Sequence, residues 1–168
     1  MTDPLPDELG AHVSSAGGVA EAPARARALD SGVLQLLTKQ PNRWAEPSVD
    51  EATADAFREA RAAHRIAVAG AHDSYLINLS SPKPALWDRS LASFTAELRR
   101  CSILELDFLV THPGNATDGD MEEGIRRNAR GVTLALEEVG EGPTRILLEL
   151  TAGTGTSVGG SFEALAAI

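Results

Sequence analysis

Short apolar runs alternate along the chain with longer amphipathic stretches. The apolar runs have the length of β-strands and are apolar almost throughout, as in strands buried on both faces of a parallel sheet. We predict strands over Leu9–Val13, Val33–Thr38, Ile66–Ala71, Phe108–His112 and Ile146–Leu150. We predict helices over Val19–Asp30, Asp50–His64, Ala85–Cys101, Met121–Val139 and from about Phe162 onward. This alternation predicts right-handed βαβ units and therefore a parallel α/β fold.

The number of these units indicates part of a barrel. A complete (βα)8 TIM barrel has eight units in about 250 residues, whereas we predict four to five units in these 168 residues. We therefore expect an α/β fold in which residues 9–168 form a partial TIM barrel, preceded by a flexible N-terminus at residues 1–8. A doubly wound open sheet is the alternative layout.

Composition and charge narrow the class of protein. The chain has 15 basic and 24 acidic residues and a formal net charge of −9, which disfavours a nonspecific nucleic-acid binder with a basic face. A nuclease is still possible, because a bound metal ion and a few basic groups can hold a phosphate. The single cysteine, Cys101, excludes a disulfide framework and a thiolate metal cluster. We expect a cytoplasmic protein without a membrane span or a signal peptide.

Three potential metal ligands stand where predicted strands end. His72, His112 and Glu149 each close an apolar run and precede a turn or a helix. Parallel barrels build their active sites at the carboxyl ends of their strands, and two imidazoles with a carboxylate are a common zinc-binding set. The alternatives are structural histidines and a salt bridge from Glu149 to an arginine across the barrel mouth. Asp73 is a candidate for orienting the His72 ring.

Further candidates lie on the same predicted rim. His12 ends the first predicted strand and is either a site residue or a structural one. Lys39 and Arg43 follow the second predicted strand, where they either hold DNA phosphates or belong to an ordinary loop. Tyr75 and Leu76 begin the loop after the third. Such a pair usually belongs to a core, but on a nucleic-acid enzyme exposed apolar side chains insert between bases.

Five segments of the chain carry a resemblance to a known family. They are Gly10–Gly18, Leu37–Trp44, His72–Leu79, His112–Gly114 and Glu149–Gly153. In this order they resemble the endonuclease IV family of apurinic/apyrimidinic endonucleases, also called deoxyribonuclease IV. The resemblance runs from about residue 9 to the last residue, and the first and third segments are its most specific parts.

The resemblance implies the first four to five units of a TIM barrel that binds up to three zinc ions. It implies a DNA base-excision repair enzyme that hydrolyses the phosphodiester 5′ to an abasic site and leaves a 3′ hydroxyl. His72 and His112 would be ligands of the first zinc, and Glu149 a catalytic carboxylate that bridges the first and second. Tyr75 and Leu76 would enter the DNA at the lesion. The implied partner is double-stranded DNA with abasic sites, with no organic cofactor and a monomeric full-length protein.

The chain departs from the family pattern at several positions. Leu150 stands where the family usually has an asparagine, Asn115–Ala116 replace a Ser-His pair, and Asn42 lies where some members place an arginine. The family's other zinc ligands come from the second half of the barrel. We therefore expect a truncated chain in which at most one zinc site is largely present. The alternatives are a xylose-isomerase-like, metal-dependent barrel that acts on a sugar, and a noncatalytic remnant.

Overall fold

The computed structural model describes residues 9–168, so the predicted flexible N-terminus at residues 1–8 lies outside the described residues. The strands are β1 (Gly10–His12), β2 (Val33–Leu37), β3 (Val68–His72), β4 (Phe108–Thr111) and β5 (Arg145–Leu148). The helices are η1 (Val19–Glu21), α1 (Ala22–Ala28), α2 (Glu51–Ala63), α3 (Pro84–Ile103), α4 (Met121–Val139) and α5 (Phe162–Ala166). Every predicted element has a counterpart, and the first predicted helix is divided into a 3-10 turn and an α-helix.

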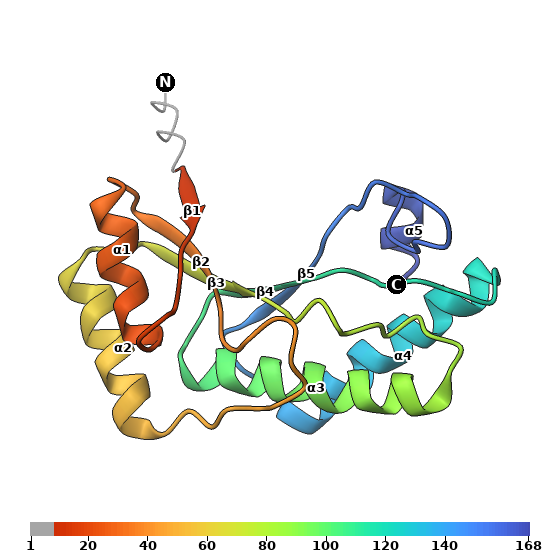
Figure 1. Cartoon of the computed structure of the whole chain (residues 1–168), viewed down its shortest axis with the longest axis horizontal. Helices are drawn as coiled ribbons and strands as arrows, with labels where there is room; N and C mark the ends of the chain where they lie inside the picture. The colour runs from red at the N-terminus through yellow and green to blue at the C-terminus, as the bar shows by residue number, and fades with distance from the viewer. Residues whose placement is uncertain (1–8) are drawn as a thin grey trace.

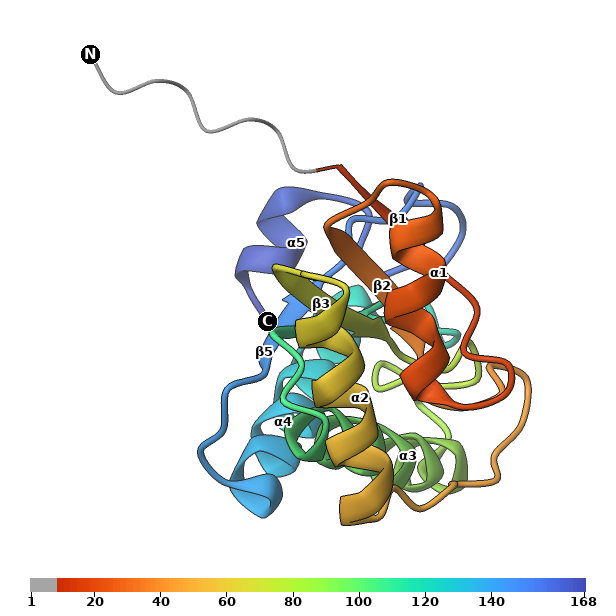
Figure 2. The same ribbon diagram turned by 90° about the vertical axis from the view of Figure 1, so that its left-hand side faces the viewer.

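The strands of the described part are all parallel and follow the order β1-β2-β3-β4-β5. Figure 1 shows α1 to α4 along one side of this sheet, and Figure 2 shows α1 and α2 next to each other on one flank. A doubly wound sheet would reverse its strand order at a switch point, so that alternative is wrong. The sequential order is that of a barrel wound in one direction, and the prediction of a partial TIM barrel is confirmed.

The hydrophobic core lies between the sheet and the helices. Leu34 and Leu36 of β2 and Leu109 of β4 are buried on the helix-facing side of the sheet, and Phe57 of α2 and Phe94 of α3 pack into the same cluster. Complete burial of a side chain of this size stabilises a fold by about 1.5–3 kcal/mol. Burial of these side chains therefore holds the helices against the strands and gives the strand ends a rigid base.

The other face of the sheet is only partly covered within residues 9–168. Gln35, Leu37 and Val110 alternate with buried neighbours and are half-buried, and Leu147 of the edge strand β5 is 43% exposed. This differs from our prediction of strands buried on both faces. A closed barrel fills its interior with side chains from strands around the whole ring, whereas these strands form an open sheet.

Side-chain caps set where several helices begin. The Asp50 carboxylate accepts a hydrogen bond from the Thr53 N–H at 2.9 Å, and the Asp120 carboxylate accepts one from the Glu123 N–H at 3.0 Å. Such a cap stabilises a helix by about 1 kcal/mol. Because α2 and α4 follow the carboxyl ends of β2 and β4, these caps also mark where the rim loops end. None of the helices within residues 9–168 has both the length and the apolar composition needed to cross a membrane.

Candidate metal centre and surrounding rim

The carboxyl ends of three neighbouring strands bring His72, His112 and Glu149 together. His72 is the last residue of β3, His112 directly follows β4, and Glu149 directly follows β5. One potential ligand atom from each residue lies within 4.8 Å of those from the other two. The structure thus places the three residues side by side, as parallel strands that end on one rim require.

The distances within this group suit one zinc ion. The Nε2 atom of His72 lies 3.2 Å from Oε2 of Glu149, and Nε2 of His112 lies 3.6 Å from the same oxygen. The two imidazole rings are 5.0 Å apart between centroids and nearly perpendicular. Two ligands about 2.1 Å from a tetrahedral zinc lie about 3.4 Å from each other. The donor types and these two nitrogen–oxygen separations therefore fit this metal.

Hydrogen bonding orients the His72 ring. Its Nδ1 atom lies 2.9 Å from the main-chain oxygen of Asp73, and a carbonyl oxygen can only accept. Nδ1 can therefore donate to this oxygen, which leaves Nε2 facing the Glu149 carboxylate. A metal-binding histidine usually has its other ring nitrogen hydrogen-bonded in this way.

Asp73 lies closer to the His72 ring with its main-chain oxygen than with its carboxylate. The nearer carboxylate oxygen is 3.5 Å from His72 Nδ1, while the other accepts a 2.6 Å hydrogen bond from the Thr111 hydroxyl. Burial raises the pKa of Asp73 well above its usual value, although the bond from Thr111 acts in the opposite direction. The Asp73 side chain therefore joins β3 to β4 below the ligands.

His12 lies on the same rim but outside the ligand group. Its Nδ1 atom is 3.2 Å from the amide nitrogen of Gln35. Partial burial, and after it the charge of His72, lowers the pKa of His12. His12 also lines a cavity of about 540 Å³ between the loops that follow β1 and β2. Its placement is compatible with either of the roles that we predicted.

The Tyr75–Leu76 turn borders the candidate metal centre. The Ile77 N–H donates to the Ser74 carbonyl at 3.0 Å, which closes a turn with Tyr75 and Leu76 at its tip. Tyr75 is 62% exposed, and its ring centroid lies 6.1 Å from that of His72. Leu76 is half-buried. An aromatic residue of the core would be buried, so Tyr75 is a surface residue beside the potential metal ligands.

The two cations predicted to contact DNA have different surroundings. Arg43 is exposed. The Lys39 side chain is 2% exposed, and its Nζ atom lies 2.5 Å from Oε1 of Glu46 and 2.9 Å from Oγ of Ser93. Both phosphate contacts stay predictions. A contact from Lys39 would require its ion pair to open, whereas one from the exposed Arg43 would not.

Lys39 belongs to a buried ionic network that sequence analysis missed. Arg100 of α3 lies 2.8 Å from Glu46 and 3.0 Å from Glu97, and its Nε donates to the Thr38 hydroxyl at 2.9 Å. Burial would raise the pKa of Glu46, but hydrogen bonds from Lys39, Ser93 and Arg100 lower it overall. The available signal was the position of Glu97 and Arg100 beside the apolar face of the predicted helix 85–101.

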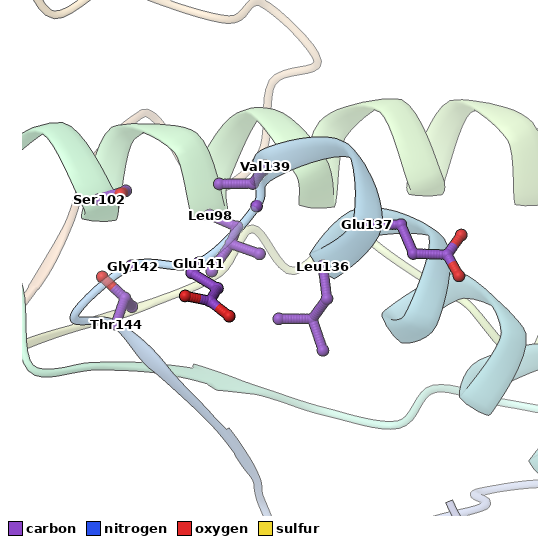
Figure 3. Close-up of a pocket in the computed structure, with 9 residues that line it drawn as sticks. Leu98, Ser102, Leu136, Glu137, Val139, Glu141, Gly142 and Thr144 are labelled. Atoms are coloured by element: carbon purple, nitrogen blue, oxygen red, sulfur yellow. The ribbon is translucent and has the colours of Figure 1, made fainter.

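Another cavity lies away from the rim. This cavity has a volume of about 620 Å³. Figure 3 shows Leu98 of α3, Leu136 and Val139 of α4, and Glu141, Gly142 and Thr144 among the residues that line it. The segment 140–144 precedes β5, so the cavity is at the amino end of the sheet. It lies at the opposite end of the strands from His72, His112 and Glu149 and is not part of the candidate metal centre.

Comparison with known proteins places this fold and site in a family. Residues 23–168 match the family described as xylose isomerase-like TIM barrel, and the chain belongs to that family. Within it, the chain is similar to endonuclease IV, which confirms the resemblance seen in the sequence. It is 44% identical over 162 residues to the probable endonuclease 4 of Geobacter sulfurreducens, which covers 96% of this chain and 55% of that protein.

Further relatives agree with this assignment. The probable endonuclease 4 of Chloroflexus aurantiacus is 40% identical over 158 residues, which are 94% of this chain and 55% of that protein. The crystal structure of endonuclease IV from Thermus thermophilus matches with a TM-score of 0.82 and 35% identity, over 94% of this chain and 58% of that one. The chain thus spans little more than half the length of these relatives. A D-tagatose 3-epimerase-like protein, at 14% identity and a TM-score of 0.68, shares the fold alone.

Proposed function

We propose that this protein is a zinc-dependent apurinic/apyrimidinic endonuclease of DNA base-excision repair. It would hydrolyse the phosphodiester 5′ to an abasic site and leave a 3′ hydroxyl. The observation that carries the proposal is the convergence of His72, His112 and Glu149 on the rim that also exposes Tyr75. The similarity to endonuclease IV supports the reaction, and the likeness to sugar epimerases concerns only the fold, so a sugar substrate has no comparable support.

The residues of this chain have distinct roles in the proposed centre. His72 and His112 would hold a zinc ion through Nε2, and Glu149 would hold it through its carboxylate. A bound zinc ion supplies hydroxide at neutral pH and stabilises negative charge on the phosphate. The Asp73 carbonyl lies within hydrogen-bond distance of Nδ1 of His72, which leaves Nε2 free to hold the metal. The half-exposed side chain of Glu149 leaves the centre open to a substrate.

DNA recognition would come from the rim loops. An abasic site lacks one base, so the apolar side chains of Tyr75 and Leu76 can fill the gap in the stack. The exposed guanidinium of Arg43 would pair with a backbone phosphate. With a net charge of −9, such contacts are local rather than spread over a basic face. The partner would be double-stranded DNA, bound by a monomer in the cytoplasm, where the DNA of bacteria such as these relatives lies.

Incision of a duplex with one abasic site tests this proposal. A form that also carries the family's remaining zinc ligands is expected to cut 5′ to the lesion with zinc and to stop cutting after chelation. Glu149→Gln is expected to abolish cutting, whereas Glu141→Gln, the same change at an exposed position at the other end of the sheet, is expected to have no effect. Equal cutting by both variants would refute the role of Glu149. Bound abasic duplex without cutting, together with less than one zinc per chain, would support a noncatalytic remnant instead.

A further inference from the structure

The separation of the three potential ligands depends on the loops that follow their strands. His72 precedes the loop 73–83, His112 lies in the loop 112–120, and Glu149 lies in the loop 149–161. The paired register of β4 and β5 ends at Thr111 and Leu148, so His112 and Glu149 lie beyond it, and the Glu149 N–H still donates to the Thr111 carbonyl at 2.9 Å. Contacts between these loops therefore contribute to the ligand geometry, above all for His112.

Asn78 joins the first two of these loops. Its Oδ1 atom accepts a hydrogen bond from the main-chain N–H of Asn115 at 2.9 Å, and its Nδ2 atom donates to the main-chain oxygen of Asn115 at 3.0 Å. A side-chain amide that pairs with both polar groups of one residue imitates a rung of a β-ladder. Oδ1 also accepts from the Ser80 N–H at 3.1 Å, and the Asn78 N–H donates to Oγ of Ser90 in α3 at 3.0 Å. Asn78 is therefore held in place on its own side of the contact.

The turn that contains Gly114 is shaped to receive this amide. Gly114 has a φ of 93°, and a Cβ atom there would lie 2.2 Å from Oδ1 of Asn78, so only glycine fits. The main-chain oxygen of Pro113 accepts a 2.6 Å hydrogen bond from the Ser80 hydroxyl and another of 2.6 Å from the Asn128 amide. Hydrogen bonds from the loop after β3 and from α4 therefore hold the turn after β4 in place.

The same turn is paired with the loop that follows β5. Asn115 forms an isolated antiparallel bridge with Ser157, and main-chain hydrogen bonds of 2.9 Å join the segments on both sides of that bridge. A continuous series of hydrogen bonds therefore runs from the loop after His72, through Asn78 and Asn115, to the loop after Glu149. It connects the segments that carry all three potential ligands.

We propose that Asn78 is a positioning residue of the metal centre. Its amide holds the loop that contains His112 against the loop that follows His72, and so sets the ligand separation before a metal ion binds. The inference rests on the proposed function for the presence of that metal. Direct hydrogen-bond partners of metal ligands typically change metal affinity by about 10–100-fold. Asn78 acts through the loop that carries His112, so a change of about tenfold is expected. The hydrogen bonds of Asn78 also connect the Tyr75–Leu76 turn to the metal centre, because Asn78 and this turn belong to the same segment, 73–80.

The test is the Zn²⁺ affinity of the metal-free protein, measured by competition with a chromogenic chelator. Asn78→Ala removes the clamp. Asn78→Asp keeps the shape and the acceptor but sets a carboxylate oxygen against the Asn115 carbonyl. Thr144→Val is the matched control, because it removes a 2.8 Å hydrogen bond to the Leu106 carbonyl at the opposite end of the sheet. Both Asn78 variants are expected to bind Zn²⁺ about tenfold more weakly, with wild-type affinity in the control.

The possible outcomes separate this inference from the proposed function. Wild-type affinity in folded Asn78→Asp would overturn the positioning role, and that variant decides the matter if Asn78→Ala does not fold. Equal weakening in Thr144→Val would also overturn it, because the effect would then follow from stability alone. A wild-type protein that binds no Zn²⁺ would instead remove the metal centre, and with it the proposed function.

Discussion

Glu46→Gln is expected to destabilise the fold markedly, although Glu46 lies in a loop. The carboxylate of Glu46 contacts Lys39 at 2.5 Å and Arg100 at 2.8 Å, and these cationic side chains are only 2% and 4% exposed. Removing one partner of a buried pair costs about 3–5 kcal/mol, because the remaining charge stays buried without compensation. Here the Glu46 side chain is 30% exposed and Arg100 keeps Glu97, so we expect about 2–3 kcal/mol.

Chemical denaturation of the metal-free protein measures this loss. Glu138→Gln is the matched control, because Glu138 pairs with Arg99 at 2.9 Å while the two side chains are 60% and 52% exposed. An exposed pair of this kind contributes about 0–1 kcal/mol. For a domain of this size, the Glu46 variant should also unfold about 4–12 °C lower. Equal destabilisation by the two variants would refute the argument that burial of Lys39 and Arg100 makes the difference.

The pH dependence of this contribution has a defined sign. The pKa of Glu46 in the folded protein is lowered from its usual 4.5. The folded state therefore favours the ionised carboxylate, and its contribution is fully present above that value. It is lost as pH falls through the lowered pKa of the folded state. The stability gap between wild-type protein and Glu46→Gln should accordingly be constant near neutral pH and narrow in acid.

Two other substitutions test the rim. Gly114→Ala should lower the thermal midpoint of unfolding more than Gly119→Ala. Both glycines have positive φ, but only at position 114 would the new Cβ meet another residue, at 2.2 Å from Asn78. Similar midpoints in the two variants would contradict this close approach. Tyr75→Ala should weaken binding of an abasic duplex about tenfold, as measured by fluorescence anisotropy, because loss of one aromatic contact with a base costs about 1–3 kcal/mol. The zinc content of this variant should stay unchanged. Unchanged DNA affinity would exclude Tyr75 from the interface.

The convergence of the ligands was predictable because it follows from topology. His72, His112 and Glu149 each close an apolar run, and parallel strands present their carboxyl ends on one rim. The predicted helix bounds were also close to the observed ones. Helix α4 (Met121–Val139) begins after the capping residue Asp120 and ends before Gly140. These features depend on local sequence and on one rule of chain winding, so no knowledge of side-chain packing was needed.

Other features depend on contacts between distant segments and were not predictable. Lys39 stands in a rim loop, where a lysine is usually solvated, but it is buried by Glu46 and by Ser93 of α3. The clamp between Asn78 and Asn115 depends on the shape of an intervening turn, which the amino-acid pattern does not specify. Pairwise contacts across 37 to 54 residues of sequence arise only once the sheet and helices have assembled.

Zinc content per chain after exhaustive dialysis tests most directly whether the ends of β3, β4 and β5 form a zinc centre. The wild-type protein and His64→Ala, which changes a histidine at the end of α2, are expected to retain one zinc ion. His72→Ala, His112→Ala and Glu149→Ala are each expected to lose it. Equal zinc content in all five proteins, or none in the wild type, would contradict the account.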